Sequence, residues 1–273
     1  MGPKLLTIDV GNSAAKLRAW SLDDDGALGC GARAEVSTAD ADSAAVTEFL
    51  AAHAQAEHVG MCSVAAAELT RRWREQLTRR GCAEPELDAG LDNRTLEPDR
   101  VGRDRLFAAR GALEILGESA LVIDVGTAMT VDALVLGTWE AHVRGWRSAA
   151  FLGGAITPGP NLLARALQLG TARLIEVEPK PDPAALGRDT RAALISGIGI
   201  GLRGAARELA LEIGRETQLG DAAIVLTGGA RAFVRGAFAK RRVIEVEDLV
   251  HLGICAALLR GAGLDRPAGF GLK

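Results

Sequence analysis

The sequence has no tyrosine, and lysine is scarce although lysine and arginine together number 32. The five lysines are Lys4, Lys16, Lys180, Lys240 and Lys273. Because 35 acidic residues offset the basic ones, the formal net charge is −3 and the pI is near 5.9. This balance argues against a general electrostatic attraction to nucleic acid or to anionic membranes. We therefore expect neither nucleic acid nor a membrane as a partner.

Cysteine and histidine patterns that bind metals are also missing. The four cysteines form no CxxC pair, and the four histidines show neither HxxxH nor HExxH spacing. These absences argue against a disulfide scaffold and against zinc-hydrolase chemistry. Cysteines scattered in this way are typical of a reducing compartment, so a cytoplasmic location is expected.

No hydrophobic run is long enough to cross a bilayer. The most apolar stretch, residues 192–202, is far shorter than the roughly 20 residues that a membrane span needs. The chain has 273 residues, of which 48% are hydrophobic and 25% charged. Such a composition can bury a sizeable core, and the length is suited to two domains.

Two segments of the sequence resemble each other. Residues 5–20 read LLTIDVGNSAAKLRAW and residues 121–135 read LVIDVGTAMTVDALV, so that Asp9 corresponds to Asp124. Each is a strand-like run that ends in Ile-Asp-Val-Gly, followed by a turn of small residues and a second apolar run. The repeat predicts an α/β protein with two similar domains, residues 1–117 and 118–273.

The remaining elements follow from apolar spacing and from turn residues. Strands are expected over residues 61–65, 222–226 and 242–246. A loop is expected over 177–187, and the tail from Gly261 is expected to be frayed. Helices are expected over 44–58, 66–80, 102–116, 161–169, 190–217, 231–238 and 247–260.

The first candidate site is the turn from Asp9 to Lys16. A carboxylate at a strand end, followed by a glycine turn, can hold hydrated Mg²⁺ and bind phosphate oxygens. Lys16 would add a positive charge from the second strand. The alternative is a hairpin in which Asp9 and Asn12 only satisfy the turn. The matching turn at Asp124 favours the phosphate interpretation.

The second candidate is the segment Val101-Gly-Arg-Asp-Arg105 at the start of a helix. Asp104 would lie in the first turn, where the helix dipole favours its ionised form, and could accept a proton. Arg105 could bind a substrate carboxylate. Alternatively, Asp104 is an ordinary acidic residue of a first turn and both arginines are solvated.

Two glycine-rich segments and one threonine are weaker candidates. Residues 153–159 (GGAITPG) and 226–230 (LTGGA) would let the backbone approach a ligand closely, although structural turns explain them equally well. Thr190 could donate a hydrogen bond to a substrate, but an N-capping role is the ordinary expectation.

Taken in order, these segments resemble the type III pantothenate kinase family of the acetate and sugar kinase, Hsp70 and actin superfamily. The matching pieces run from residue 8 to residue 230 and are IDVGNSAAK, VGRDR, IDVGTAMTVD, FLGGAITPG, LGRDT, LISGI and LTGGA. The resemblance implies two ribonuclease-H-like domains of the actin-like ATPase fold, with a nucleotide cleft between them. It also implies ATP-dependent phosphorylation of pantothenate, the first step of coenzyme A synthesis, by a homodimer.

The resemblance also implies roles for single residues. Asp104 matches the catalytic base, Asp124 the ligand of a monovalent cation (K⁺ or NH₄⁺), and Thr127 an ATP contact. The pantothenate contacts would be Gly102, Arg103, Asp104, Arg105 and Thr190. The ATP-binding hairpin, which would act with Mg²⁺, would be Asp9, Val10, Gly11, Asn12, Ser13, Ala14, Ala15 and Lys16.

Three positions depart from the family pattern. Ser13 replaces the usual threonine, and Thr95 stands where many members have a tyrosine that faces the substrate. The stretch 136–151, with Trp139 and Trp146, is longer than the usual link and could reshape the acceptor pocket. Two alternatives therefore stay open: a kinase for another hydroxylated acceptor, and a nucleotide-binding regulator without turnover. An ionised Asp104 facing the acceptor would argue against the regulator.

Overall fold

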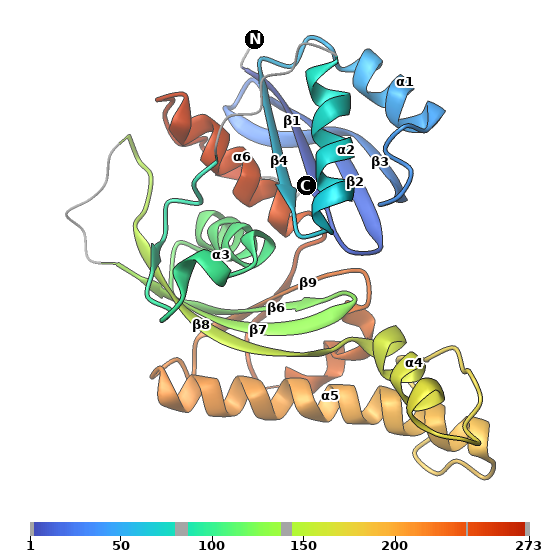
Figure 1. The fold of residues 1–273 in the computed structure, drawn as a ribbon. Coiled ribbons are helices and arrows are strands. Elements are labelled where there is room, and N and C mark those ends of the chain that lie inside the picture. The colour runs from blue at the N-terminus through green and yellow to red at the C-terminus, as the bar shows by residue number, and fades with distance from the viewer. Residues whose placement is uncertain (1–2, 80–86, 138–143, 239, 271–273) are drawn as a thin grey trace. The chain divides into compact units, whose positions relative to one another are not determined.

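The computed structural model describes residues 3–79, 87–137, 144–238 and 240–270 (Figure 1). Its contacts divide the chain into two compact units. Unit 1 contains Met1–Glu118, Leu136–Phe151 and Asp248–Lys273, and unit 2 contains Ser119–Val135 and Leu152–Glu247. The first border thus falls next to the expected boundary at 117/118. The units are not continuous halves, however, because two later segments belong to unit 1.

Unit 1 is built on a five-stranded sheet in the order β11-β3-β2-β1-β4. β1 pairs antiparallel with β2 and parallel with β4, while β2 and β3 are antiparallel. The alternation of β1 explains the two faces of this sheet, because Leu6 and Ile8 enter one apolar core and Thr7 points to the other side. The strands are β1 Lys4–Val10, β2 Ala14–Leu22, β3 Ala27–Ser37, β4 His58–Ser63 and β11 Gly269–Phe270.

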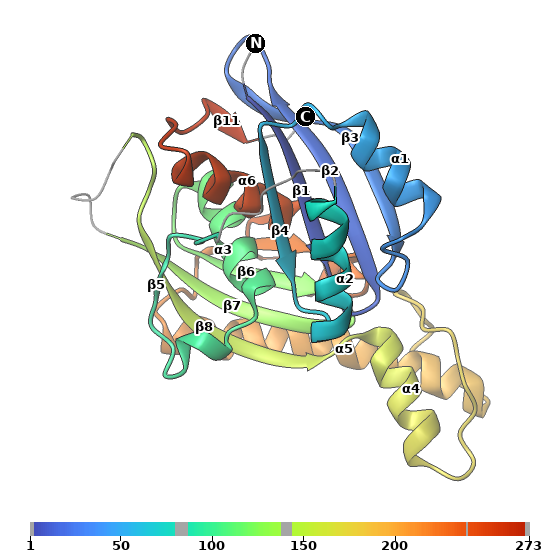
Figure 2. The ribbon, with the colours of Figure 1, turned by 45° about the horizontal axis from the view of Figure 1, so that its top comes forward.

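Helices cover both faces of the unit 1 sheet (Figure 2). On one face, Val46 of α1 (Ala44–Ala52) and Trp73 of α2 (Ala67–Thr78) are buried in the core with Leu6 and Ile8. On the other face lies α6 (Leu249–Gly261), which packs along α3 (Arg103–Leu116). A short 3₁₀ turn, Pro98–Arg100, precedes α3.

Unit 2 contains a second sheet, in the order β10-β9-β6-β7-β8. β6 pairs antiparallel with β7 and parallel with β9, and β10 is parallel to β9. β5 (Asp92–Asn93) pairs with Ala150 and Phe151 of β8, which belong to unit 1. The strands are β6 Ala120–Val125, β7 Ala128–Leu136, β8 Ala149–Pro158, β9 Ala223–Thr227 and β10 Val243–Glu245.

The two sheets repeat one topology. The order β3-β2-β1-β4 in unit 1 matches β8-β7-β6-β9 in unit 2. In each sheet the hairpin (β1 and β2, or β6 and β7) is antiparallel. The strand on the other side of its first strand (β4 or β9) is parallel to that strand. The sequence repeat predicted two similar α/β domains, and the resemblance implied that they are ribonuclease-H-like; the mixed sheets agree with both expectations. The internal repeat is therefore confirmed in three dimensions.

The long helix α5 (Thr190–Glu216) runs along the unit 2 sheet, and the shorter helix α4 (Pro160–Gly170) lies beside one end of α5 (Figure 1). α5 buries Leu202, Ala206 and Ala210 in the core formed with β6, β7 and β9. Its first half packs against α4 instead. Two 3₁₀ turns, Arg231–Phe233 and Arg235–Phe238, replace the expected helix over 231–238.

Several local expectations were wrong. β3 was not predicted, and residues 153–158 belong to strand β8 rather than to a turn. The tail is not frayed throughout, because Gly269 and Phe270 pair with Ala27 and Leu28 of β3. The loop over 177–187 is confirmed. Among the described residues, no helix is both long and apolar enough to cross a membrane.

Candidate functional site

The hairpin of β1 and β2 in unit 1 places Asp9 directly opposite Lys16. Between the strands, Gly11 N–H donates to the Ala14 carbonyl at 3.0 Å, which closes the turn. Asn12 and Ser13 at the tip are exposed, while Asp9 and Lys16 are half-buried. The arrangement leaves a carboxylate, an ammonium group and an open polar turn at one end of the sheet, which suits a hydrated phosphate ligand.

Thr38, which the sequence analysis missed, supports this turn. Its hydroxyl donates to the Gly11 carbonyl at 2.7 Å, and its N–H donates to the Ser13 carbonyl at 3.1 Å. Thr38 follows β3 directly and is buried. A threonine at the end of an unpredicted strand gives no signal of this role in the sequence.

The Gly102–Arg105 segment forms the start of α3 in unit 1, as expected. Asp104 lies in the first turn, and its Oδ1 accepts a hydrogen bond from the Arg105 N–H at 2.9 Å. A Cβ atom on Gly102 would lie 2.5 Å from that oxygen. Glycine at 102 is therefore needed for the position that the Asp104 carboxylate occupies.

Burial adds an effect on the Asp104 carboxylate that the sequence analysis did not consider. Burial raises its pKa above the ordinary 3.8, although the Arg105 N–H and the Arg105 charge act in the opposite direction. The helix start was expected to favour the ionised carboxylate; desolvation acts against that form and raises the pKa, while ionisation of Asp104 near neutral pH stays a prediction. A raised pKa brings the group closer to neutral pH, which is the direction that suits a general base.

The two arginines beside Asp104 point to different partners. Arg103 donates to the Leu87 carbonyl at 2.6 Å and lies over the Phe107 ring. It also lines a cavity of about 430 Å³ together with Asp88 and Leu106. Arg105 lies 5.5 Å from the centre of the Phe151 ring. The solvated alternative is wrong for Arg103, because its guanidinium has a fixed carbonyl partner.

In unit 2, three glycine-containing segments come together around Asp124. Gly126 N–H donates to the Ala128 carbonyl at 2.9 Å, which closes the second hairpin as Gly11 closes the first. A Cβ on Gly228, whose φ is +92°, would lie 2.4 Å from Asp124 Oδ1. A Cβ on Gly159 would lie 2.1 Å from the Gly126 carbonyl oxygen. Gly228 and Gly159 therefore allow their segments to pack closely against the hairpin of β6 and β7.

The resemblance implies bound cations, and the residues around Asp9 and Asp124 show what kind of cation site the chain offers. Among the described residues, no group of three or more His, Cys, Asp or Glu side chains is gathered. Asp9 and Asp124 are each a single half-buried carboxylate next to a turn with backbone carbonyls. Each is an oxygen-only site with a single protein carboxylate, which can hold a largely hydrated cation but forms no all-protein cage around it. Thr127, the expected ATP contact, is exposed at the tip of the second hairpin.

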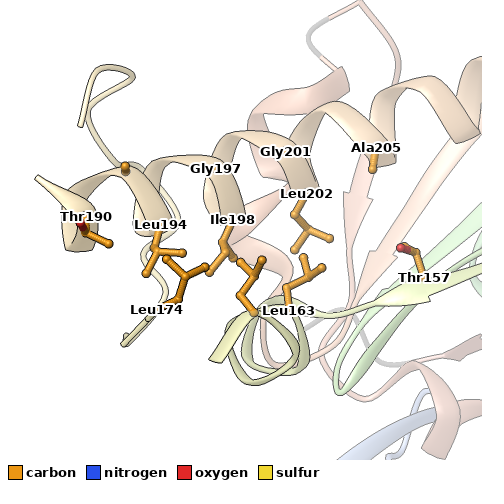
Figure 3. A pocket seen from close by; sticks show the side chains of 12 residues that line it. Thr157, Leu163, Leu174, Thr190, Leu194, Gly197, Ile198, Gly201, Leu202 and Ala205 are labelled. Carbon is orange, nitrogen blue, oxygen red and sulfur yellow. The ribbon is translucent and has the colours of Figure 1, made fainter. Parts of the chain in front are cut away.

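Thr190 begins α5, but it is not the N-cap. Asp189 has that position, and its Oδ1 accepts from the Ala192 N–H at 2.8 Å. The Thr190 side chain is left to line a groove of about 480 Å³ between α4 and α5 (Figure 3). Thr157 lies at the opposite end of the groove, and the side chains between the two threonines are apolar.

The departures from the family pattern have structural counterparts. Thr95 Oγ1 donates to Asn93 Oδ1 at 2.8 Å, so its hydroxyl is engaged within its own loop. Trp146 is buried and packs against Arg110 and Phe270 within unit 1. Trp139 lies outside the described residues.

The sequence was also compared with known families. The family described as type III pantothenate kinase matches residues 5–212, which is most of the chain. The chain belongs to the type III pantothenate kinase family. A protein of this name from Thermomicrobium roseum is 33% identical over 177 residues, covering 63% of this chain and 62% of the relative. One from Halorhodospira halophila is 35% identical over 166 residues, covering 60% and 61%. The chain thus matches about three fifths of the length of these relatives.

Solved structures confirm the fold class of this family member. A putative Baf family transcriptional activator from Campylobacter jejuni is 20% identical with a TM-score of 0.57, covering 95% of this chain and 100% of that one. A glucokinase from an Antarctic psychrotroph is 14% identical with a TM-score of 0.51, over the same shares of the two chains. At these identities the likeness shows the shared two-domain fold alone.

Proposed function

We propose that this protein transfers the γ-phosphoryl group of ATP to the 4′-hydroxyl of pantothenate, the first step of coenzyme A synthesis. Family membership supports the proposal, and the single structural observation that carries it is the placement of Asp104. This carboxylate is half-buried at a helix start, has a raised pKa, and occupies space that only glycine at 102 leaves open.

In the proposed reaction, Asp104 accepts the proton of the pantothenate hydroxyl. The hydroxyl oxygen forms a bond to the γ-phosphorus of ATP while the bond from that phosphorus to the bridging oxygen breaks. The products are 4′-phosphopantothenate and ADP, and the proton stays on Asp104 until it exchanges with solvent. Little covalent chemistry is required of the protein, because positioning and charge neutralisation dominate phosphoryl transfer.

The remaining site residues are assigned to binding. Asp9 to Lys16 and Thr127 contact ATP, with Asp9 holding Mg²⁺ through water and Lys16 neutralising phosphate charge. Arg103, Arg105 and Thr190 contact pantothenate, and Arg105 binds its carboxylate. Asp124 holds K⁺ or NH₄⁺. When bound, the cations offset negative charge near the phosphates.

The protein is further inferred to be a homodimer that uses the α4–α5 groove of unit 2 as part of its interface. Gly199 of α5 packs within the chain, since its Cβ would lie 2.6 Å from the Lys180 carbonyl oxygen. A Cβ on Gly197, Gly201 or Gly204 would meet nothing within 4 Å among the described residues. The surface around the groove also exposes Leu162, Leu167, Leu169, Ile175 and Leu186. An open apolar surface of this kind suits a second copy.

The test is ADP release by purified protein with ATP, Mg²⁺ and K⁺, with pantothenate or one of a panel of other hydroxylated acceptors. We expect release that depends on pantothenate and is lost in Asp104→Asn. Faster release with another acceptor would reassign the substrate. ATP binding without release for any acceptor would favour the nucleotide-binding regulator.

A further inference from the structure

Helix α3 begins at the Asp104 segment and ends in a buried ionic cluster. Arg110 is fully buried, Glu114 is 2% exposed, and the two side chains form an ion pair along the helix. Arg266, far away in sequence, donates from Nε to Glu114 Oε2 at 2.6 Å and from Nη2 to the Glu114 carbonyl at 2.7 Å. One guanidinium therefore holds both the side chain and a terminal backbone carbonyl of α3.

Arg266 belongs to a segment, residues 264–270, that we call the C-terminal strap. The strap is fixed along its length within unit 1. The Leu264 carbonyl accepts from Trp146 Nε1 at 2.9 Å, and the Arg266 N–H donates to the Arg144 carbonyl at 3.0 Å. At its end, β11 pairs with β3. The strap thus gives Arg266 a rigid base from which to hold α3.

The cluster also engages the unusually long 136–151 stretch. The Arg110 guanidinium donates to the Arg147 carbonyl at 3.0 Å and lies 5.5 Å from the Trp146 ring centre. Burial, together with repulsion from Arg260 and Arg266, lowers the pKa of Arg110 to about 10, so it remains charged at neutral pH. Two guanidiniums therefore share the Glu114 carboxylate inside unit 1.

A buried ion cluster adds little stability that apolar packing could not supply, but it fixes geometry through directional bonds. The contact of α3 with α6 lacks that directionality. A Cβ on Gly111 would lie 2.2 Å from the Leu249 carbonyl oxygen, and one on Gly253 would lie 1.9 Å from that of Phe107. The two glycines let the backbones of α3 and α6 approach closely, and such van der Waals contacts fix the position of α3 along its axis less sharply than directional hydrogen bonds do.

We propose that Arg266 is a positioning residue, which sets the axial position of α3 through Glu114 and thereby the position of the Asp104 carboxylate. Glu114 and Asp104 are on the same helix, about 15 Å apart along its axis at 1.5 Å per residue. A displacement applied at one end of a rigid helix reaches the other end undiminished. The expected effect of Arg266 on the reaction rate rests on the proposed function. Its expected effect on the position of the Asp104 carboxylate does not depend on that function.

The test compares Arg266→Met, which keeps an unbranched apolar stem but removes the guanidinium group and its charge, with Arg144→Met. Arg144 is an exposed arginine near the strap and pairs only weakly with Asp265, at 3.8 Å. At a temperature where near-UV circular dichroism shows all variants folded, Arg266→Met should lower kcat about tenfold or more. Its KM for ATP should stay within about twofold of wild type, because the base acts only in the transition state. Arg266→Lys should restore part of the loss, and Arg144→Met should match wild type.

A second readout does not depend on activity. The Asp104 carboxyl is titrated by ¹³C NMR in the same variants. If α3 shifts in Arg266→Met, the carboxyl leaves its buried position and its pKa falls toward 3.8, while Arg144→Met leaves it unchanged. Wild-type kcat together with a wild-type Asp104 titration in Arg266→Met would overturn the proposal. If wild type fails to phosphorylate pantothenate, the proposed function falls and the titration alone decides the positioning role.

Discussion

At the scale of single residues, the position of the Asp104 carboxylate depends on the absence of a side chain at Gly102. In Gly102→Ala the new methyl group would lie 2.5 Å from Asp104 Oδ1 and displace the carboxylate. The backbone conformation at 102, with φ −56° and ψ 127°, is open to alanine, so stability should fall by about 1 kcal/mol or less. We expect kcat to fall about 100-fold, the loss typical of a reacting group displaced by about 1 Å.

Steady-state kinetics and a thermal melt of Gly102→Ala test this prediction. Gly29→Ala in β3 is a suitable comparison for a small added side chain, because Gly29 is exposed and a Cβ there would meet nothing within 4 Å among the described residues. A Gly102→Ala variant with wild-type kcat would show that the carboxylate position is not critical.

The raised pKa of Asp104 predicts the acid side of the pH profile. Asp104 accepts a proton only when ionised, so kcat/KM should fall as pH decreases through a pKa above the ordinary 3.8. The variant Asp104→Asn should lose about 10²–10⁴-fold in kcat and also lose this pH dependence. If the residual kcat/KM of Asp104→Asn falls at low pH in the same way as that of wild type, the titrating group is not Asp104.

At the scale of elements, the second hairpin and the turn after β9 form one local unit around Asp124. The variant Gly228→Ala would strain a residue at φ +92° and place a Cβ 2.4 Å from Asp124 Oδ1. Displacement of the carboxylate should raise the K⁺ concentration for half-maximal rate about 10-fold to 100-fold. Gly229→Ala is the matched control, since a Cβ there meets nothing within 4 Å among the described residues.

The measurement is the rate against K⁺ at saturating Mg²⁺ in a Tris buffer free of Na⁺ and K⁺. Full wild-type activity in that buffer without added K⁺ would remove the monovalent cation from the mechanism. Asp124 would then be assigned to Mg²⁺ or to structure alone.

Elements with strong local signals could be predicted from the sequence. The two Ile-Asp-Val-Gly hairpins were predicted because alternation and turn glycines are local features, and α3 because its apolar spacing ends at Gly117, which adopts φ +67°. The alternating small residues of β3 and the glycines of β8 have weak strand propensity, so tertiary pairing decides their structure. The role of Thr38 and the Arg266–Glu114 contact join distant segments and leave no local pattern.

At the scale of the whole molecule, the groove between α4 and α5 predicts the oligomeric state. Gly201 is exposed and lines this groove, so Gly201→Glu adds a charge there without an internal clash and improves helix propensity. We expect sedimentation at micromolar concentration to give a dimer for wild type and a monomer for Gly201→Glu. Arg207→Gln makes the same change in net charge at an exposed position of α5 and should remain dimeric.

A wild-type mass near 28.5 kDa under these conditions would contradict the homodimer. If Gly201→Glu stays dimeric, the protein is still a homodimer, but the groove between α4 and α5 is not part of its interface.

Phosphoryl transfer to the pantothenate hydroxyl is most directly tested by ³¹P NMR of the reaction mixture. With ATP, Mg²⁺, K⁺ and pantothenate, we predict a phosphate monoester signal coupled to the protons of the 4′-methylene group. It should grow in step with ADP and be absent in Asp104→Asn. If ADP accumulates with inorganic phosphate alone, or no ATP is consumed, the protein does not phosphorylate pantothenate and the account is contradicted.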